Sequence, residues 1–174
     1  TSPISYLLSP ISYLLPPLTP PIPMSDYKAW LKNIENLDRD IKIAFVAWEF
    51  NYEYTSQLVE DNSHFLRSHG FENIESYYVP GAFEIPAFAQ KLLETEEYDL
   101  IITIGVVIRW ATPHFDYVCG ESSRAIMDLT LAYDTPIIFG ILTCNTEEQV
   151  KERMWHGFAV SGLNLLAEIE KIKG

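Results

Sequence analysis

The sequence has few of the residues from which metal sites, disulfide scaffolds and nucleic-acid-binding surfaces are built. Its 174 residues include two cysteines, Cys119 and Cys144, with no Cys-x-x-Cys motif and no metal-type spacing to histidine. We therefore expect no metal site and two reduced, structural thiols. Lys and Arg number 12 against 24 Asp and Glu, for a net charge of -12. This excess of acid disfavours nucleic acid and anionic membrane surfaces as partners.

Long hydrophobic runs and the commonest catalytic motifs are also absent. The longest apolar run, residues 101–108, is interrupted by Thr103 and Gly105 and is far shorter than the roughly 20 residues that span a bilayer. GxGxxG, GxxxxGK[ST], HExxH and GxSxG do not occur, which argues against the usual nucleotide-binding, metalloprotease and hydrolase classes. Hydrophobic residues make up 48% of the chain, enough for a substantial core.

The N-terminal segment, residues 1–23, carries no charge and holds seven of the eleven prolines. SPISYLL at residues 2–8 is repeated unchanged at residues 9–15. Dense proline favours extended chain, so we expect this segment to be disordered or not part of the native protein, with Met24 as a candidate natural start. It has no basic region typical of a signal peptide, and the lack of a targeting signal favours a cytoplasmic protein.

From residue 24 to residue 174 the sequence predicts a single domain in which strands and helices alternate. The predicted strands cover residues 41–47, 74–79, 99–108 and 136–142. The predicted helices cover residues 55–69, 84–94, 116–132 and 146–173, the last with a break near Gly157 or Gly162. Residues 29–34 fit a helix or a strand. The alternation predicts an α/β three-layer sandwich, a flavodoxin-like central four-stranded parallel sheet flanked by helices. Ligands bind such sheets beyond the carboxyl ends of the strands.

Several side chains at those strand ends have both a chemical and a structural interpretation. Thr112 and the start of the helix that follows it could bind an anion, or Thr112 could only cap the helix. His114, beside the positive end of that helix, is either a general acid–base group or a structural histidine. Phe50 could stack on a planar ring or pack in the core. Glu84 could bind hydroxyl groups or favour the start of a helix, and Arg153 on its own resembles an exposed helix residue.

Five segments together carry a resemblance to a known family: FN at residues 50–51, VPGAFEIP at 79–86, GVVIRWATPHFDYV at 105–118, PIIFGILT at 136–143 and EEQVKER at 147–153. The sequence resembles the lumazine synthase family over residues 41–172. The resemblance implies the lumazine synthase fold and a transferase of riboflavin biosynthesis that needs neither cofactor nor metal. Its substrates would be 5-amino-6-(D-ribitylamino)uracil and 3,4-dihydroxy-2-butanone 4-phosphate. The products would be 6,7-dimethyl-8-ribityllumazine, phosphate and water.

The resemblance also implies a role for particular residues. The implied substrate-binding residues are Phe50, Asn51, Ala82, Phe83, Glu84, Val107, Ile108 and Phe139. The implied phosphate-binding residues are Ala111, Thr112 and Arg153, and His114 would shuttle protons. Phe139 and Arg153 would come from the adjacent subunit of a homo-oligomer, either a pentamer or a larger shell. Riboflavin synthase is a candidate partner.

The chain departs from the family pattern at three positions. Trp110 stands where the family usually has glycine, and tryptophan is costly there if the position needs a positive φ. Trp48 replaces what is commonly a small residue. The usual Asn-Lys-Gly corresponds to residues 160–162, so Ser161 stands in place of a lysine. An alternative function follows: a catalytically weakened or inactive homologue that binds a flavin or lumazine, or forms a shell.

Overall fold

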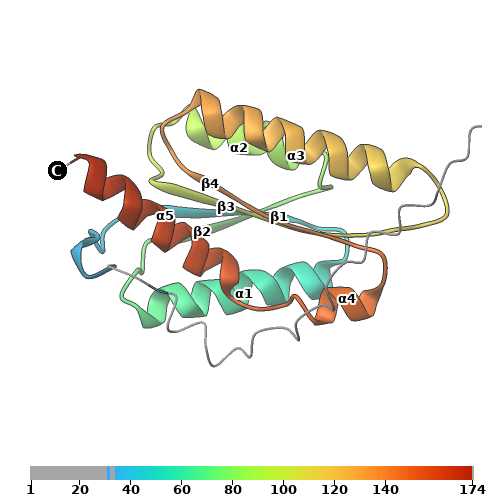
Figure 1. Ribbon diagram of the computed structural model, residues 1–174, viewed down its shortest axis with the longest axis horizontal. Coiled ribbons are helices and arrows are strands. Elements are labelled where there is room, and N and C mark those ends of the chain that lie inside the picture. Colours follow the sequence, from blue (N-terminus) through green and yellow to red (C-terminus); the bar gives the residue numbers. More distant parts are fainter. Residues whose placement is uncertain (1–30, 32–33, 174) are drawn as a thin grey trace, which may run out of the picture.

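The structure of the protein is a computed structural model that describes Leu31 and residues 34–173. A short 3-10 helix, η2 (Ile34–Asn36), precedes alternating strands and helices (Figure 1). The strands are β1 (Ile43–Trp48), β2 (Ile74–Val79), β3 (Leu100–Ile108) and β4 (Ile137–Cys144). The helices are α1 (Tyr52–Ser68), α2 (Ile85–Leu93), α3 (His114–Ala132), α4 (Glu147–Lys151) and α5 (Gly157–Lys173). The tail at residues 1–23 and most of residues 29–34 lie outside the described residues.

The strands form one sheet of four parallel strands in the order β2-β1-β3-β4. The central strands β1 and β3 are buried almost throughout, as their continuous apolar sequences predict. The edge strands are less buried: in β2 only Val79 is buried, and β4 contains both buried and exposed residues. The predicted parallel α/β sheet is therefore confirmed, and all four strand ends point the same way.

Helices cover both faces of the sheet, which makes three layers (Figure 1). On one face α2 and α3 pack together, and on the other α1 packs against α5 with α4 beside it. A hydrophobic core lies on each face of the sheet, and successive side chains of β1 point into the two cores alternately. Phe45 packs in the core under α1 and α5, whereas Ala44 and Val46 pack in the core under α2 and α3. This period-two alternation is the pleat of a strand that is buried on both faces.

The predicted C-terminal helix divides into α4 and α5 at one of the two predicted glycines. α5 begins at Gly157, and a Cβ there would overlap the ring of Trp155. Gly162, the other candidate, lies inside α5, where it packs against Leu100. Thr146 is the N-cap residue of α4, and its hydroxyl accepts a hydrogen bond from the Gln149 N–H at 3.3 Å.

Candidate active site

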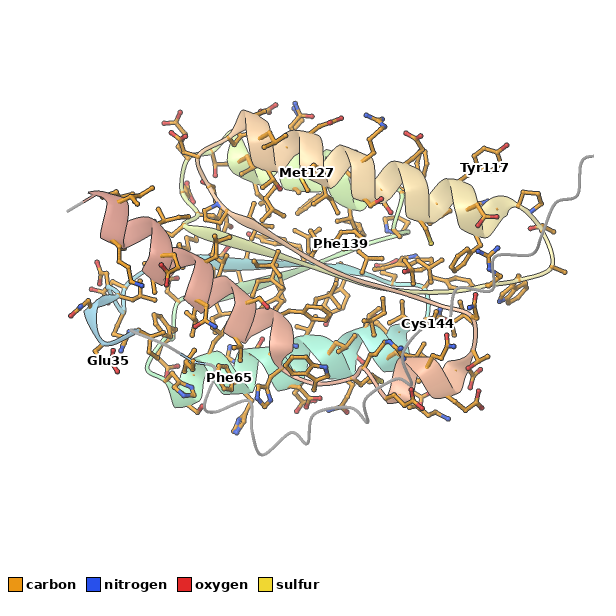
Figure 2. The ribbon with its side chains drawn as sticks, viewed as in Figure 1. Glu35, Phe65, Tyr117, Met127, Phe139 and Cys144 are labelled. Carbon is orange, nitrogen blue, oxygen red and sulfur yellow. The ribbon has the colours of Figure 1, made fainter. Side chains whose placement is uncertain are left out.

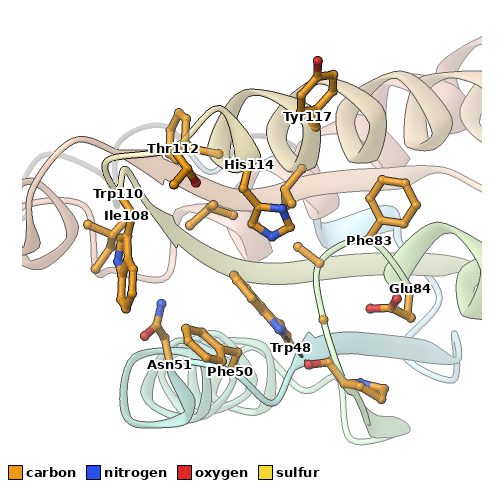
Figure 3. Close-up of a pocket in the computed structure, with 16 residues that line it drawn as sticks. Trp48, Phe50, Asn51, Phe83, Glu84, Ile108, Trp110, Thr112, His114 and Tyr117 are labelled. Atoms are coloured by element: carbon orange, nitrogen blue, oxygen red, sulfur yellow. Dashed lines mark hydrogen bonds between the residues drawn. The ribbon is translucent and has the colours of Figure 1, made fainter.

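A cavity of about 840 Å³ opens at the carboxyl ends of β1, β2 and β3. This is the edge of the sheet at which the sequence predicts ligand binding. Figure 3 shows aromatic side chains on opposite sides of the cavity, with His114 between them. The lining residues are Trp48, Phe50, Asn51, Pro80, Gly81, Ala82, Phe83, Glu84, Val107, Ile108, Trp110, Thr112, His114, Phe115, Tyr117 and Val118.

The loop after β1 is held in place by its backbone and by two polar side chains. Asn51 has a left-handed conformation (φ 55°, ψ 39°), which asparagine tolerates better than most residues. Its Nδ2 donates a 2.7 Å hydrogen bond to the carbonyl oxygen of Val106 in β3. The hydroxyl of buried Thr55 donates to the carbonyl oxygen of Trp48 at 2.7 Å. These bonds set the direction in which Phe50 leaves the sheet.

Trp48 and Phe50 form a stacked aromatic pair in the wall of the cavity. Their ring centroids lie 5.3 Å apart and their planes differ by 21°. Trp48 Nε1 donates a 2.9 Å hydrogen bond to the carbonyl oxygen of Pro80, in the loop after β2. Trp48, the last residue of β1, therefore joins the end of that strand to the loop after β2 and widens the apolar surface beside Phe50.

The loop after β2 presents a carboxylate to the cavity. The N–H of Glu84 donates to the carbonyl oxygen of Gly81 at 3.1 Å, and Glu84 is the N-cap residue of α2. A Cβ on Gly81 would lie 2.5 Å from the Glu84 carboxylate oxygen Oε2. Glycine at position 81 thus leaves room for the carboxylate to fold back over the loop. Phe83 is exposed beside it and also lines the cavity.

The loop after β3 carries the candidate acid–base and anion-binding groups. α3 begins at His114, two residues earlier than predicted, because Pro113 caps it and accepts hydrogen bonds from the N–H groups of Asp116 and Tyr117. The first amide groups of a helix have no partner within that helix and point toward bound anions. Thr112 and His114 both line the cavity at this end.

The condition under which Trp110 would strain the backbone, a positive φ, is not met. Among the described residues other than glycine, the positive φ angles belong to Asn51 and Glu96, so Trp110 has an ordinary backbone conformation. Its side chain is 73% exposed and lines the cavity. An indole at this position adds aromatic surface at the mouth of the site without a conformational penalty.

The lining of the cavity contains no lysine or arginine from the described part of this chain. Within the same residues, no group of three or more His, Cys, Asp or Glu side chains could hold a metal ion. Burial raises the pKa of both Cys119 and Cys144, which keeps these thiols protonated at neutral pH. The chemistry of this cavity is therefore that of one histidine, one carboxylate, the hydroxyl groups of Thr112 and Tyr117, the amide of Asn51 and an aromatic wall.

A comparison with known families agrees with this geometry. Residues 40–164 match the family model described as 6,7-dimethyl-8-ribityllumazine synthase. The match covers well over half of the chain and includes every strand and all of the loops that line the cavity. The chain belongs to the 6,7-dimethyl-8-ribityllumazine synthase family. Its fold is the flavodoxin-like α/β fold expected of that family, and the family implies transferase activity in riboflavin biosynthesis.

The structure brings most of the predicted lumazine synthase site residues to the one cavity. Those that line it are Phe50, Asn51, Ala82, Phe83, Glu84, Val107, Ile108, Thr112 and His114. Ala111 belongs to the same loop as Thr112 but does not line the cavity. Phe139 lies on β4 between the two helical layers (Figure 2), and Arg153 follows α4; neither lines the cavity of its own chain.

Sequence reasoning missed the contribution of the first turns of α3 to this cavity. Phe115, Tyr117 and Val118 line the cavity together with His114. Tyr117 and Val118 follow His114 at the i+3 and i+4 spacing that places residues on one face of a helix, which could have revealed them. The lysine-replacing Ser161 is exposed within α5 and lies outside the lining. Among the described residues, no helix is long and apolar enough to cross a membrane.

Proposed function

We propose that the protein condenses 5-amino-6-(D-ribitylamino)uracil with 3,4-dihydroxy-2-butanone 4-phosphate to form 6,7-dimethyl-8-ribityllumazine. The observation that carries this proposal is the convergence of Phe50, Thr112 and His114 on one cavity at the strand ends. An aromatic wall, an anion-binding helix end and a histidine are the three parts that this condensation needs. Riboflavin synthase is the candidate consumer of the product.

The pyrimidine would lie against the aromatic pair. Phe50 is exposed to the cavity and backed by Trp48, so a planar ring can stack on it. The Glu84 carboxylate, a hydrogen-bond acceptor, would receive ribityl hydroxyl groups together with the backbone of Ala82 and Phe83. Val107 and Ile108 would line the ring pocket at the end of β3.

The phosphate of the second substrate would bind where α3 begins. The Thr112 hydroxyl and the backbone amides near Ala111 and Thr112 supply donors there. Because the cavity lining of the described chain contains no cation, a dianionic phosphate would need one from elsewhere. Arg153 of an adjacent subunit would provide it, since a guanidinium holds phosphate through two parallel hydrogen bonds.

The chemistry would consist of proton transfers between two reactants held side by side. The exocyclic amine adds to the butanone carbonyl and water leaves as the imine forms. Phosphate then leaves by elimination, and the resulting enol becomes a carbonyl. Attack of the ribitylamino nitrogen on that carbonyl closes the new ring with loss of a second water. His114 would take and return protons in these steps, which contributes typically 10²–10⁴-fold to a rate. Alignment of the two substrates would supply a larger share of the acceleration.

A homo-oligomer follows from the same proposal, because Phe139 and Arg153 lie outside the cavity of their own chain. Two further features support association. The apolar side chains of Tyr117, Met127 and Leu131 are exposed along α3, and Figure 2 shows the first two on that helix. Phe139 is exposed on the edge strand β4. Exposed apolar surface of this kind marks sites of protein association. A pentamer is the smallest unit expected, and a larger shell would contain the same contacts.

Turnover of the full-length protein tests the proposal. Purified protein is mixed with both substrates, lumazine absorbance is followed, and the same mixture without protein serves as the blank. A rate well above the blank, much reduced in Arg153→Ala at low concentrations of the butanone phosphate and retained in Lys151→Ala, is the expected result. A folded oligomer whose rate equals the blank would overturn the proposal.

One feature favours a second candidate function, the binding of a flavin or lumazine without catalysis. The stacked Trp48 and Phe50 offer a broader platform than a single pyrimidine requires. A non-catalytic protein of this kind would bind riboflavin or the lumazine with quenching of tryptophan fluorescence, and would show no turnover above the blank. Loss of that binding in Trp48→Ala, with no turnover in the parent protein, would favour this candidate.

A further inference from the structure

Arg109, the first residue after β3, lies outside the cavity but makes contacts on every side of its guanidinium. Nη1 and Nη2 donate to the two carboxylate oxygens of Asp116, at 3.2 and 2.8 Å. Nε donates to Asn145 Oδ1 at 3.1 Å. The plane lies over the ring of Phe115, with the central carbon 4.2 Å from the ring centroid. Such a bidentate, stacked arrangement needs the planar fork of arginine.

The contact with Asn145 continues into the next loop of the site. The Asn145 N–H donates to Gln149 Oε1 at 2.8 Å, and Arg153 Nη1 donates to the carbonyl oxygen of Gln149 at 2.8 Å. The N–H of Arg109 itself donates to the carbonyl oxygen of Cys144 at 2.9 Å. Arg109 therefore joins the loop after β3 to the segment that carries Arg153.

The loop enclosed by this ion pair is the one proposed to bind phosphate. Asp116 follows Arg109 by seven positions, and every residue from 110 to 114 between them is exposed. Burial therefore does not hold Thr112 and His114 in place. The Arg109–Asp116 pair closes the base of the loop, and the stacked ring of Phe115 fixes the angle at which α3 leaves it.

The surface ion pair of Arg67 does not have this arrangement. Arg67 forms one contact with Glu72, at 3.9 Å, and its side chain is 49% exposed, close to the 45% of Arg109. Pairs of that kind contribute little to stability, about 0–1 kcal/mol. Comparing variants of Arg109 with a variant of Arg67 therefore separates an effect on phosphate binding from an effect on the stability of the fold.

We propose that Arg109 is a positioning residue of the phosphate-binding loop, acting through Asp116, Phe115 and Asn145 rather than by contact with substrate. It holds Thr112 and His114 at a fixed separation and links their loop to the segment that ends in Arg153. This inference rests on the proposed function, because it assigns the loop a phosphate-bearing substrate.

Three variants and one control test the proposal: Arg109→Lys, Asp116→Asn, the double variant, and Arg67→Lys as the matched arginine-to-lysine change. Lysine keeps the charge of Arg109 but loses the fork and the stacking. We expect Arg109→Lys to raise KM for the butanone phosphate about tenfold, the scale of one lost charge-assisted hydrogen-bond pair. KM for the pyrimidine should change less than twofold, and the thermal midpoint should stay within about two degrees of that of Arg67→Lys.

Asp116→Asn distinguishes positioning from direct phosphate binding. If Arg109 only positions the loop, Asp116→Asn weakens phosphate binding as Arg109→Lys does, and the double variant is no worse than either single one. If Arg109 were itself a phosphate ligand, releasing it from Asp116 would leave binding unchanged or tighten it, and the proposal would be overturned. Equal rises in both KM values, together with a lower thermal midpoint than the control, would also overturn it.

A binding measurement separates failure of this inference from failure of the proposed function. Calorimetric titration of the full-length protein and its variants with inorganic phosphate needs no turnover. A parent protein that binds phosphate without turnover, with binding weakened about tenfold in Arg109→Lys, would support the positioning role and reject the proposed reaction. A parent protein that binds no phosphate at all, or binds it equally in Arg109→Lys and Arg67→Lys, would reject the positioning role.

Discussion

The side-chain amide of Asn51 donates a hydrogen bond to the backbone carbonyl of Val106, 55 positions further along the chain, at 2.7 Å. This bond joins the loop after β1 to β3 near the carboxyl end of that strand, where Val106 is fully buried. Asn51 also carries the left-handed backbone that directs Phe50 into the cavity. One residue thus sets both the shape of a loop and the place of the aromatic ring proposed to stack on the substrate.

Substitutions at Asn51 should separate these two roles. Asn51→Gly keeps the left-handed backbone but loses the hydrogen bond, and should lower the free energy of unfolding by about 1 kcal/mol. Asn51→Ala should cost roughly 1–2 kcal/mol more, because a Cβ penalises this conformation. Urea unfolding at fixed protein concentration measures both. If both variants lost the same free energy of unfolding, the role assigned to the left-handed backbone at residue 51 would be contradicted.

Removing His114 should slow the reaction without abolishing it. His114→Ala loses the proton shuttle, and we expect kcat to fall about 10²-fold while substrate alignment keeps the rate above the blank. His64→Ala is the control, since His64 is exposed on α1 and lies outside the cavity lining. An unchanged kcat in His114→Ala would show that this histidine transfers no proton.

Arg153 should act on the site of a neighbouring subunit. Arg153→Ala is expected to raise KM for the butanone phosphate by ten- to a hundredfold, the scale of a lost charged hydrogen bond. Lys151→Ala, which removes an exposed cation two residues earlier, should leave KM within about twofold.

Mixed oligomers test the origin of that arginine. Arg153→Ala subunits keep His114, and His114→Ala subunits keep Arg153. If each site combines two subunits, unfolding and reassembling the two impaired proteins together should restore full activity at some interfaces. No recovery, in hybrids whose mixed composition is shown by mass spectrometry, would place both residues in the site of one chain.

Glu75 should make the stability of the protein sensitive to acid. The hydroxyl groups of Tyr77 and Tyr98 donate hydrogen bonds to the Glu75 carboxylate, and Lys42 Nζ lies 3.2 Å from Glu75 Oε1. The two tyrosine hydrogen bonds and, to a smaller extent, Lys42 lower the pKa of Glu75 to about 2. A lowered folded-state pKa adds stability above the ordinary pKa of about 4.3. That stability is lost as the pH falls through about 2.

We therefore expect Glu75→Gln to lower the urea midpoint at about pH 6 and to differ little from the parent protein near pH 2. Glu72→Gln is the control, because Glu72 is exposed and contacts Arg67 only at 3.9 Å. If Glu75→Gln lowered the urea midpoint by the same amount at both pH values, the role assigned to the ionised carboxylate would be contradicted.

The exposed apolar residues of α3 should hold subunits together. Leu131→Glu places a charge where the leucine side chain is 79% exposed, and should reduce the mass seen in sedimentation velocity if this surface is buried between subunits. Ile172→Glu is the control, since Ile172 is 84% exposed near the end of α5. Unchanged assembly in Leu131→Glu would show that this part of α3 faces solvent in the oligomer.

Most of the architecture could be predicted from local sequence patterns. Strand β2 lies at residues 74–79 as predicted, and β3 begins one residue later than its predicted start. The apolar runs on β1 and β3 identify buried strands because only a two-faced core accommodates so many consecutive hydrophobic residues. Helix starts were less accurate: α1 begins at Tyr52 rather than at residue 55, because Asn51 supplies a left-handed turn that no periodicity reports.

The sequence by itself determined the order of the elements, the parallel sheet and the loops on which chemistry would lie. Hydrophobic spacing and turn residues act over a few positions and are therefore readable along the chain. The tertiary structure alone shows that Trp48 bridges to Pro80 and that Arg109 closes the loop of His114. These relationships join residues from different strand ends, and their distances depend on the packing of the whole sheet rather than on any local pattern.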